Sequence, residues 1–433
     1  MNNQVQLDSA EMVDFLQHII NNNRHLQKNK NRVVATEVIG ESGLGKTSVV
    51  LQIAEKNNLE VVKLNLAQIE ELGDLVGFPV RQFELCATSE VNVPLEAPKY
   101  EMKEVKLPNG KVVKKKVEIK TPEVTSRSNK CIWVDENAVD QYIKQGYEFT
   151  GQKRMSYCPP EWIADKPAGG ILMLDDWNRA DIRFIQAVME LVDRGEYISW
   201  KLPQDWHIIL TANPDNGEYM VNTIDHAQRT RFVSVNMKWN HERWAEWAEA
   251  EGIDGRCINF VLMHPEVIQP EQGVNPRSIT TFFNCISSIP TFETSLPMIQ
   301  MVGEGSVGGD VATLFTTFIN NRLDKLITPK DMLLRKDNDQ VKKDLMAAIT
   351  NGNDYRADIA SILTTRLINY TLTYASNNPI TPEIMDRLTF LVKDEEVFTD
   401  DLKYHIVKKI LNGNKQKFGK LLFDPAVQEY ATK

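Results

Sequence analysis

The residues with the clearest chemistry lie in one glycine-rich segment near the start of the chain. Residues 40–47 read Gly-Glu-Ser-Gly-Leu-Gly-Lys-Thr and match the pattern GxxxxGK(S/T). Glycines let backbone N–H groups turn inward around phosphates, and the start of a following helix adds the positive end of its dipole. Lys46 is expected to reach the β- and γ-phosphates of ATP, and the Thr47 hydroxyl to ligate Mg²⁺. The predicted ATP-binding residues are Gly40, Glu41, Ser42, Gly43, Leu44, Gly45, Lys46, Thr47 and Ser48.

Two carboxylates follow a short apolar run later in the chain. Asp175 and Asp176 come directly after residues 171–174, which read Ile-Leu-Met-Leu. In an enzyme that binds nucleoside triphosphates, the first acid can hold the Mg²⁺ shell and the second can orient or deprotonate the attacking water. We therefore predict that Thr47 and Asp175 hold the metal and that Asp176 acts on the water. An acidic turn at a strand end is the alternative.

A polar amide and three arginines complete the predicted catalytic set. Asn213 follows the apolar run 207–212 and could hydrogen-bond the attacking water or the γ-phosphate, or it could simply end a strand as an Asn-Pro turn. Arg229 and Arg231 precede an apolar residue, and a planar cation on the γ-phosphate is often supplied by a neighbouring subunit. Arg277 follows Asn-Pro at a predicted helix start, where it could close over the phosphates. Ordinary surface charges are the alternative for all three arginines.

The elements that would position these residues alternate between strands and helices. A helix is expected over 8–28, with Asp8 as its cap and Glu11 three residues later. Uniformly apolar strands separated by helices predict a parallel sheet covered on both faces. From Lys238 the pattern is helical, and 303–309 is interpreted as a connector between two helical blocks. The other expected elements are strands at 33–39, 61–66, 171–174 and 207–212, helices at 46–56 and 183–194, and a strand or hairpin arm at 197–202.

Residues 84–160 interrupt this alternation, and we interpret them as an insertion on the α/β core. Within them, 106–120 has the pattern of a hairpin, with Asn109 and Gly110 as a type I′ turn. The lysines at 111, 114, 115, 116 and 120 partly alternate with apolar residues, as on an exposed strand edge, which lysines commonly protect. Contact with an acidic protein or a nucleic acid is the alternative, although no aromatic residues interleave for base stacking.

The bulk composition is that of an ordinary globular protein with an acidic balance. Hydrophobic residues make up 42% of the chain, which permits a sizeable core, and the length predicts about two or three domains. The net charge of −9 argues against binding of nucleic acid or anionic membranes by the whole surface. No apolar run approaches the ~18 residues of a membrane-spanning helix, and the polar first residues predict no secretory leader. The five cysteines lack metal-ligand spacing, so we expect reduced thiols and a cytoplasmic location.

The order of these motifs resembles that of a known family of ATPases. The glycine-rich loop, LMLDDWNRA (172–180), LTANP (210–214), HAQRTRF (226–232) and NPRS (275–278) are similar to motifs of the MoxR-like, dynein-related branch of the AAA+ ATPases. LGDLVGFP (72–79), YCPPEW (157–162) and LPQDW (202–206) add to the resemblance, which is good over 30–290 and looser beyond. The resemblance implies an α/β fold with a P-loop AAA+ core at 31–237, containing the 84–160 insertion, after a helical lead-in at 1–30. A helical lid at 238–300 and a C-terminal helical region at 301–433 would follow.

The resemblance also implies roles for individual residues. Asn213 would be the sensor-1 residue and Arg277 the sensor-2 arginine. Arg231 would be the arginine finger, with Arg229 as the alternative. Asp176 departs from the family pattern, which usually has Glu there, and its carboxylate is one methylene shorter. We therefore expect Mg²⁺-dependent hydrolysis of ATP to ADP and phosphate, at a slow rate.

Three functions are compatible with the sequence. Members of this branch form rings, commonly hexamers, with ATP between subunits, and they often work with a partner that carries a von Willebrand A domain. The favoured function is a homo-oligomeric ring that hydrolyses ATP to remodel or activate a partner protein, a MoxR-like chaperone role, with 196–203 as the pre-sensor hairpin. An ATP-gated assembly scaffold with little hydrolysis is the second. A nucleic-acid translocase is the third, and the acidic balance makes it the least favoured.

Overall fold

The computed structural model describes residues 5–94, 99–106, 112–119, 123–217, 219–269, 273–320, 326–352 and 354–432. The chain divides into two compact units. The first unit comprises residues 1–68, 168–185 and 204–433, and the second comprises 69–167 and 186–203. The second unit therefore extends on both sides of the insertion expected at 84–160 and includes a further segment between Gln186 and Pro203.

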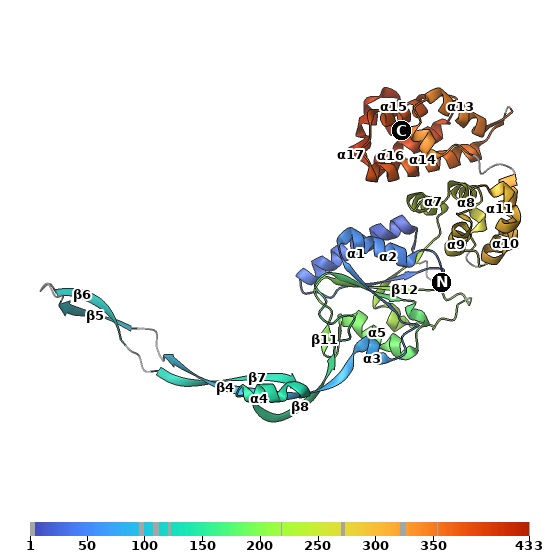
Figure 1. The fold of residues 1–433 in the computed structure, drawn as a ribbon. Coiled ribbons are helices and arrows are strands. Elements are labelled where there is room, and N and C mark those ends of the chain that lie inside the picture. The colour runs from blue at the N-terminus through green and yellow to red at the C-terminus, as the bar shows by residue number, and fades with distance from the viewer. Residues whose placement is uncertain are drawn as a thin grey trace. The chain divides into compact units, whose positions relative to one another are not determined.

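A parallel sheet of six strands forms the centre of the first unit, as the apolar runs predicted (Figure 1). All of its strand pairings are parallel, so the carboxyl ends of the strands lie at one edge. The strand that precedes the glycine-rich loop is not a direct neighbour of the strand that ends in Asp175, because the strand before Asn213 lies between them. In sheet order the strands are β1 (Gln6–Leu7), β13 (Phe232–Met237), β2 (Ala35–Ile39), β12 (Trp206–Ala212), β9 (Gly170–Asp175) and β3 (Glu60–Asn65).

Two helices, α1 (Ser9–Lys28) and α2 (Lys46–Asn57), pack on one face of this sheet (Figure 1). Their apolar side chains, such as Leu16 and Ile53, form one buried cluster with Val38, Met173 and Ile209 of the sheet. The alternate residues of β9 and β12 are buried as well, so both faces of these strands are covered. The predicted start of α1 is confirmed, because Asp8 accepts from the backbone of Glu11 while the Glu11 side chain accepts from Asp8.

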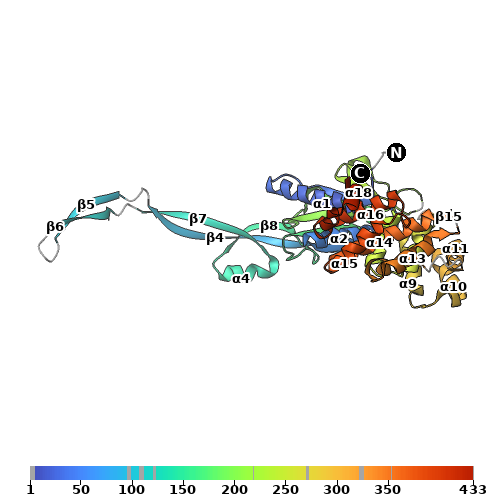
Figure 2. The ribbon, with the colours of Figure 1, turned by 90° about the horizontal axis from the view of Figure 1, so that it is seen from above.

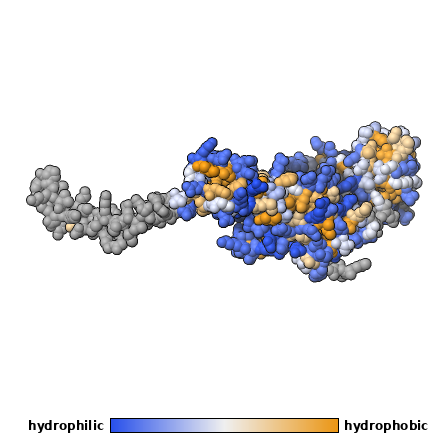
Figure 3. Space-filling model, turned by 90° about the horizontal axis from the view of Figure 1, so that it is seen from below, coloured by the Kyte–Doolittle hydropathy of each residue, from blue (hydrophilic) through white to orange (hydrophobic). Residues whose placement is uncertain are grey.

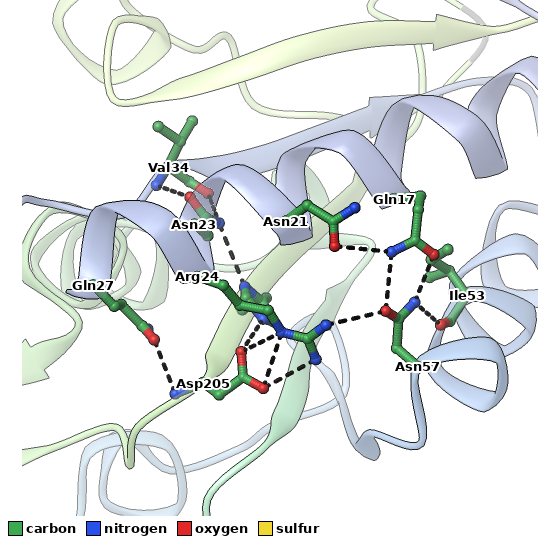
Figure 4. A network of polar contacts seen from close by, with 10 residues as sticks. Gln17, Asn21, Asn23, Arg24, Gln27, Val34, Ile53, Asn57 and Asp205 are labelled. Carbon is green, nitrogen blue, oxygen red and sulfur yellow. Dashed lines mark hydrogen bonds and ion pairs between the residues drawn. The ribbon is translucent and has the colours of Figure 1, made fainter. Parts of the chain in front are cut away.

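Polar contacts near the amino ends of the strands fix α1 to α2 and to the residues that precede β2 and β12 (Figure 4). The Arg24 guanidinium pairs with Asp205, just before β12, with Nε 2.9 Å from Oδ1. It also donates to Asn57 at the end of α2, and Gln17 exchanges two hydrogen bonds with the same asparagine. Asn23 is buried and donates to the carbonyl of Val34, ahead of β2. The helical lead-in expected at 1–30 is therefore an integral part of the core.

A helical cluster follows the sheet and extends further than the lid boundary expected at residue 300. That boundary falls inside α10, and buried residues of α11, such as Phe315, belong to the same apolar cluster as Phe282 of α9. The prediction of a connector at 303–309 is also wrong, because α10 continues through Gly303 to Val307. A Cβ at this glycine would lie 2.7 Å from that of Ala312, so the glycine permits close helix packing. The helices are α7 (His241–Ala250), α8 (Gly255–Met263), α9 (Pro276–Ile286), α10 (Leu296–Val307) and α11 (Gly309–Asn320).

The C-terminal helices form a separate apolar cluster within the first unit. A buried ion pair joins this cluster to the preceding one: Arg366 of α14 lies 3.2 Å from Glu249 of α7 and donates to Asn259 of α8. The predicted helical C-terminal region is confirmed in character. Its helices are α12 (Pro329–Leu334), α13 (Asn338–Ile349), α14 (Ala357–Asn377), α15 (Pro382–Lys393), α16 (Asp400–Gly413), α17 (Lys415–Phe418) and α18 (Pro425–Thr432).

The second unit is built on a long antiparallel ribbon. Strand β4 (Phe78–Pro94) pairs with β7 (Glu123–Asp135) along 13 residues, and β8 (Glu148–Cys158) pairs with β4 only as far as Cys86. Figures 1 and 2 show β4 and β7 continuing beyond β8 as a two-stranded ribbon. We call residues 87–130 the arm. Within the arm, β5 (Lys99–Lys106) and β6 (Val112–Ile119) form an antiparallel hairpin. The second strand of the hairpin predicted at 106–120 is confirmed, but the first lies almost wholly before residue 106. The turn at 109–110 and the lysines at 111 and 120 lie outside the described residues.

A short hairpin of β10 (Glu196–Tyr197) and β11 (Trp200–Lys201) packs at the base of this ribbon, where a hairpin was predicted. The Trp200 indole donates to the carbonyl of Val76 at 2.9 Å and meets Trp162 edge to face. The backbone N–H of Tyr157, on β8, donates to the Ser199 hydroxyl in the hairpin turn. The hairpin and the base of the ribbon therefore form one packed structure.

The prediction that all cysteines are reduced is wrong for one pair. Cys86 and Cys131 form a disulfide, although they are 45 positions apart in the sequence. They are opposite each other in the β4–β7 register, with Cα atoms 4.0 Å apart. Spacing along the sequence could not reveal this pair, because the register of the two strands brings it together. The expected cytoplasmic location therefore loses the support it drew from reduced cysteines.

In the part of the chain that the structure describes, no helix is both long and apolar enough to cross a membrane. On the face drawn in Figure 3, hydrophobic residues form separate patches among hydrophilic ones.

Replacing Gly77 with Ala should destabilise the base of the second unit. Gly77 has φ +85°, and a Cβ there would lie 1.8 Å from the carbonyl oxygen of Cys158, a backbone atom that cannot turn aside. Gly151→Ala is the matched control, because its φ is +90° but no atom lies within 4 Å. The control should lose about 1 kcal/mol from backbone strain, and Gly77→Ala roughly 3 kcal/mol or more. Thermal unfolding and limited proteolysis measure the difference, and equal effects of the two substitutions would contradict the packing described.

Candidate nucleotide-binding site

The glycine-rich loop connects the carboxyl end of β2 to the start of α2. Gly43 and Gly45 have φ of +81° and +92°, a left-handed conformation that favours glycine. The Gly40 N–H donates to the carbonyl of Ala212 at 3.1 Å, which anchors the loop to the end of β12. The strand, loop and helix thus give the backbone arrangement that the phosphate-binding motif requires.

Lys46 is buried at the centre of this loop, with 8% of the residue exposed. Its Nζ donates to the carbonyls of Gly40 and Glu41, at 2.5 and 3.1 Å, and to Asn213 Oδ1 at 3.1 Å. Burial lowers the pKa of the ammonium to about 8, although the charges of Asp176, Asp175 and Glu41 act in the opposite direction. All three of these acceptors are neutral oxygens. An anion bound beside the ammonium would therefore stabilise its charge.

The two strand-end carboxylates lie near Lys46 and each is already engaged. Asp175 accepts from the Thr211 hydroxyl at 2.5 Å through Oδ1, and its Oδ2 lies 2.8 Å from the Lys63 ammonium. Asp176 accepts from Asn213 Nδ2 at 2.9 Å, and its other oxygen lies 3.6 Å from Arg179. Asn213 therefore contacts both the buried ammonium and the carboxylate predicted to act on water.

A buried partner that the sequence reasoning did not identify holds Asn213 in place. The Asn178 amide donates to the carbonyl of Asn213 at 2.8 Å and accepts from its N–H at 3.2 Å. Both asparagines are buried. Asn178 lies three residues after Asp175, so its closeness to the acidic pair was the one signal that pointed to it. This exchange fixes the end of β12 against the turn that follows β9.

Two further residues that sequence reasoning missed cover the glycine-rich loop. The Tyr219 hydroxyl donates to Glu41 Oε2 at 2.6 Å and accepts from the Ser42 N–H at 3.2 Å. Asn216 donates to the other oxygen of Glu41 at 3.3 Å. These contacts hold the segment after Asn213 against the loop, and no motif marks them.

The start of α9 lies against the glycine-rich loop, as the predicted position of Arg277 requires. Asn275 caps α9 by accepting from the backbone of Arg277 and Ser278, at 3.0 Å each. A Cβ at Gly43 would lie 2.6 Å from Asn275 Oδ1 and 3.0 Å from the Arg277 Cβ. The charge of Arg277 also contributes to lowering the Lys46 pKa. Arg277 is therefore close enough to the loop to act on a bound anion.

Arg229 and Arg231 lie away from this group of residues. They are in and after α6 (His226–Arg229), where Arg229 donates to the carbonyl of Ile224 and Arg231 to that of Ala227. Phe232 of β13 pairs with Ala35 at the start of β2, so this turn is at the amino end of the parallel strands. The glycine-rich loop is at the carboxyl end, and the two arginines are thus placed at the opposite edge of the sheet.

The oxygen ligands at the site suit Mg²⁺. A hydroxyl from Thr47 and a carboxylate from Asp175 are hard donors, and Mg²⁺ is commonly bound by one or two carboxylates together with substrate phosphates and water. Within the described residues, no group of three or more histidine, cysteine, aspartate or glutamate side chains could hold a metal unaided. The residues therefore fit a metal that binds together with the nucleotide.

Comparison with known proteins gives little beyond this geometry. No protein-family model matches the chain, and no curated protein matches it. Among solved structures, the chain is similar to a point mutant of RuvB from Thermotoga maritima, with 10% sequence identity and a TM-score of 0.33. The match covers 87% of this chain and 93% of that one.

ATP affinity should fall as the pH rises through the Lys46 pKa of about 8. Binding of a triphosphate at this loop would require the ammonium, and the charged fraction of a group with this pKa drops between pH 7 and 9, which predicts a roughly tenfold weaker affinity. Calorimetric titration with ATP at each pH measures this. Lys46→Arg is the control, because its guanidinium stays charged, so its weaker affinity should not vary. An affinity of the unmodified protein that is constant from pH 7 to 9 would contradict the prediction.

Proposed function

We propose that this chain is an AAA+ ATPase that binds ATP with Mg²⁺ at residues 40–48 and hydrolyses it. The observation that carries the proposal is the contact of one amide, Asn213, with both the buried Lys46 ammonium and the Asp176 carboxylate. These three groups come from the ends of neighbouring parallel strands, where α/β proteins bind nucleotides. The arrangement places a cation for phosphate beside a carboxylate for water.

Each residue of the site would have a separate role in binding or hydrolysis. Lys46 would exchange the carbonyls of Gly40 and Glu41 for phosphate oxygens, and its charge would then have an anionic partner. Thr47 and Asp175 would hold Mg²⁺, which neutralises charge on the phosphates when it is bound. Asp176 would orient the attacking water while Asn213 keeps the carboxylate near the γ-phosphate.

A ring of identical subunits would complete the site. Arg231, with Arg229 as the alternative, lies at the edge of the sheet opposite Lys46, and this position supports a role at a neighbouring subunit's nucleotide. Arg277 would act within its own subunit, because it lies against the glycine-rich loop. We propose a homo-oligomeric ring, a hexamer by the MoxR-like resemblance, in which each finger arginine stabilises charge in the next site.

The arm supports a role in engaging a partner protein. Beyond Cys86 the β4 strand pairs with β7 alone, and a two-stranded ribbon of this length has little core of its own. A partner surface that packs on the ribbon would supply the missing contacts. We therefore propose that ATP hydrolysis remodels or activates a protein partner held by the arm, and the resemblance favours one with a von Willebrand A domain. The net charge of −9 does not favour a nucleic acid.

An ATP-gated scaffold with little hydrolysis is the second candidate, and one observation favours it. Asp176 is held by Asn213 and lies 3.6 Å from Arg179, and its side chain is shorter than the glutamate usual in the family. A carboxylate held in this way could fail to reach the water. ATP would then order the ring without being consumed rapidly.

Phosphate release from ATP, measured with light scattering for size, should separate these candidates. Lys46→Ala should abolish ATP binding, because the loop loses its cation. Arg231→Ala should keep ATP affinity but lower turnover roughly a hundredfold or more, as expected for an arginine finger. Asp176→Asn should lower turnover roughly tenfold or more.

Arg229→Ala is the matched control for the finger, since it removes the same charge two residues away. Loss of turnover in Arg229→Ala but not Arg231→Ala would exchange the two roles. Turnover unaffected by Asp176→Asn would contradict the role of that carboxylate. A ring that forms with ATP and releases no phosphate would favour the scaffold.

Shortening the arm should separate partner binding from nucleotide binding. Residues 90–127 can be replaced by an Asn-Gly turn between Ser89 and Ser128, which are paired on β4 and β7. The disulfide and β8 are thereby retained. ATP affinity and oligomer size should stay within about twofold, because the shortened strands keep the base of the second unit. Proteins that the full chain retains from its own cells should be lost, and their undiminished retention by the shortened chain would contradict a docking role.

A further inference from the structure

A lysine outside every predicted motif contacts the carboxylate assigned to the metal. Lys63 lies on β3, the last strand of the sheet, and its ammonium is 2.8 Å from Asp175 Oδ2. The lysine side chain is 44% exposed, whereas that of Asp175 is 14% exposed. The other oxygen of Asp175 accepts from the Thr211 hydroxyl at 2.5 Å. Both carboxylate oxygens are thus engaged by groups of the chain itself.

We propose that Lys63 is a positioning residue that holds Asp175 as an internal counter-ion and leaves it when ATP binds with Mg²⁺. Lys63 thereby sets the Mg²⁺ concentration that nucleotide binding requires. This inference rests on the proposed function, because it takes Asp175 as a metal ligand. It adds a residue that no sequence motif contains and that acts before any hydrolysis takes place.

Electrostatics gives the direction of the effect. With its ammonium in place, Lys63 cancels much of the negative charge that Asp175 offers to a divalent cation. The exposed lysine can turn into solvent, so the contact is a reversible competitor and not a permanent block. Removing the ammonium should leave Asp175 more available and lower the Mg²⁺ concentration needed. At a partly exposed site in physiological salt, a change of roughly three- to tenfold is expected from one unit charge.

The effect on ATP without Mg²⁺ should have the opposite sign. Lys63 is a cation near a site for a polyanion, so its loss removes some attraction for the free triphosphate. A variant that merely lacks positive charge would therefore bind ATP more weakly in both conditions. A variant that has lost a competitor should bind metal-free ATP no better and yet require less Mg²⁺.

The experiment measures binding of a fluorescent ATP analogue to the full chain at a fixed analogue concentration while Mg²⁺ is varied. Lys63→Met is the test variant, with Lys63→Gln as a second neutral variant in case the first fails to fold. Lys63→Arg restores the charge and should behave like the unmodified chain. Lys393→Met is the matched control, because Lys393 also pairs with an aspartate, Asp424, at 2.6 Å, with a side chain that is 50% exposed.

The expected result is a Mg²⁺ midpoint that is roughly three- to tenfold lower in Lys63→Met and Lys63→Gln and unchanged in Lys63→Arg and Lys393→Met. Binding measured in a chelator should be equal or weaker in the neutral variants. An unchanged or higher midpoint in both neutral variants, with ATP binding otherwise intact, would overturn the role of Lys63 alone. An unmodified chain that binds no analogue at any Mg²⁺ concentration would overturn the proposed function and this role together.

Discussion

The site depends on a buried ammonium that has no anion in direct contact among the described residues. Lys46 donates to two carbonyls and one amide, while the acids that favour its charge, Asp175 and Asp176, contact other partners. A buried charge is costly unless it is paired, and here burial is the largest influence on the Lys46 pKa. A triphosphate would supply the missing charge, and backbone N–H groups of the loop would bind its oxygens. The site is therefore arranged to favour an anion at one place.

The parallel sheet brings the groups around this ammonium together. Strand β12 lies between β2 and β9, so its last residue, Ala212, anchors Gly40 while the next residue reaches both Lys46 and Asp176. A slip of one residue in this strand would turn Asn213 away, because side chains alternate between faces. The exchange with Asn178 and the uniformly buried β12 oppose such a slip. The register of β12 is thus required both by the packing of the sheet and by the position of Asn213 in the site.

The sequence predicted the parts of the site that follow a local pattern. Lys46, Asp175 and Asn213 come directly after strands or in a loop with a fixed spacing, so their types and order suffice. Lys63, Tyr219 and the Cys86–Cys131 pair could not be found in this way, because each depends on the register of strands or the path of a loop distant in sequence. The glycines of α10 were misread for a related reason: Gly303 serves close helix packing, which a sequence pattern does not distinguish from flexibility.

The shorter carboxylate at position 176 is consistent with the turn that carries it. Asp176 has φ +51°, a left-handed conformation that aspartate adopts more readily than residues with longer side chains. Its N–H donates to Thr211, which itself donates to Asp175, so the turn is held by the same strand that positions Asn213. The carboxylate then lies within hydrogen-bonding distance of Asn213 without the extra methylene. The length of the Asp176 side chain alone therefore does not set the rate of ATP hydrolysis. That rate would also depend on how strongly Asn213 and Arg179 hold the carboxylate in place.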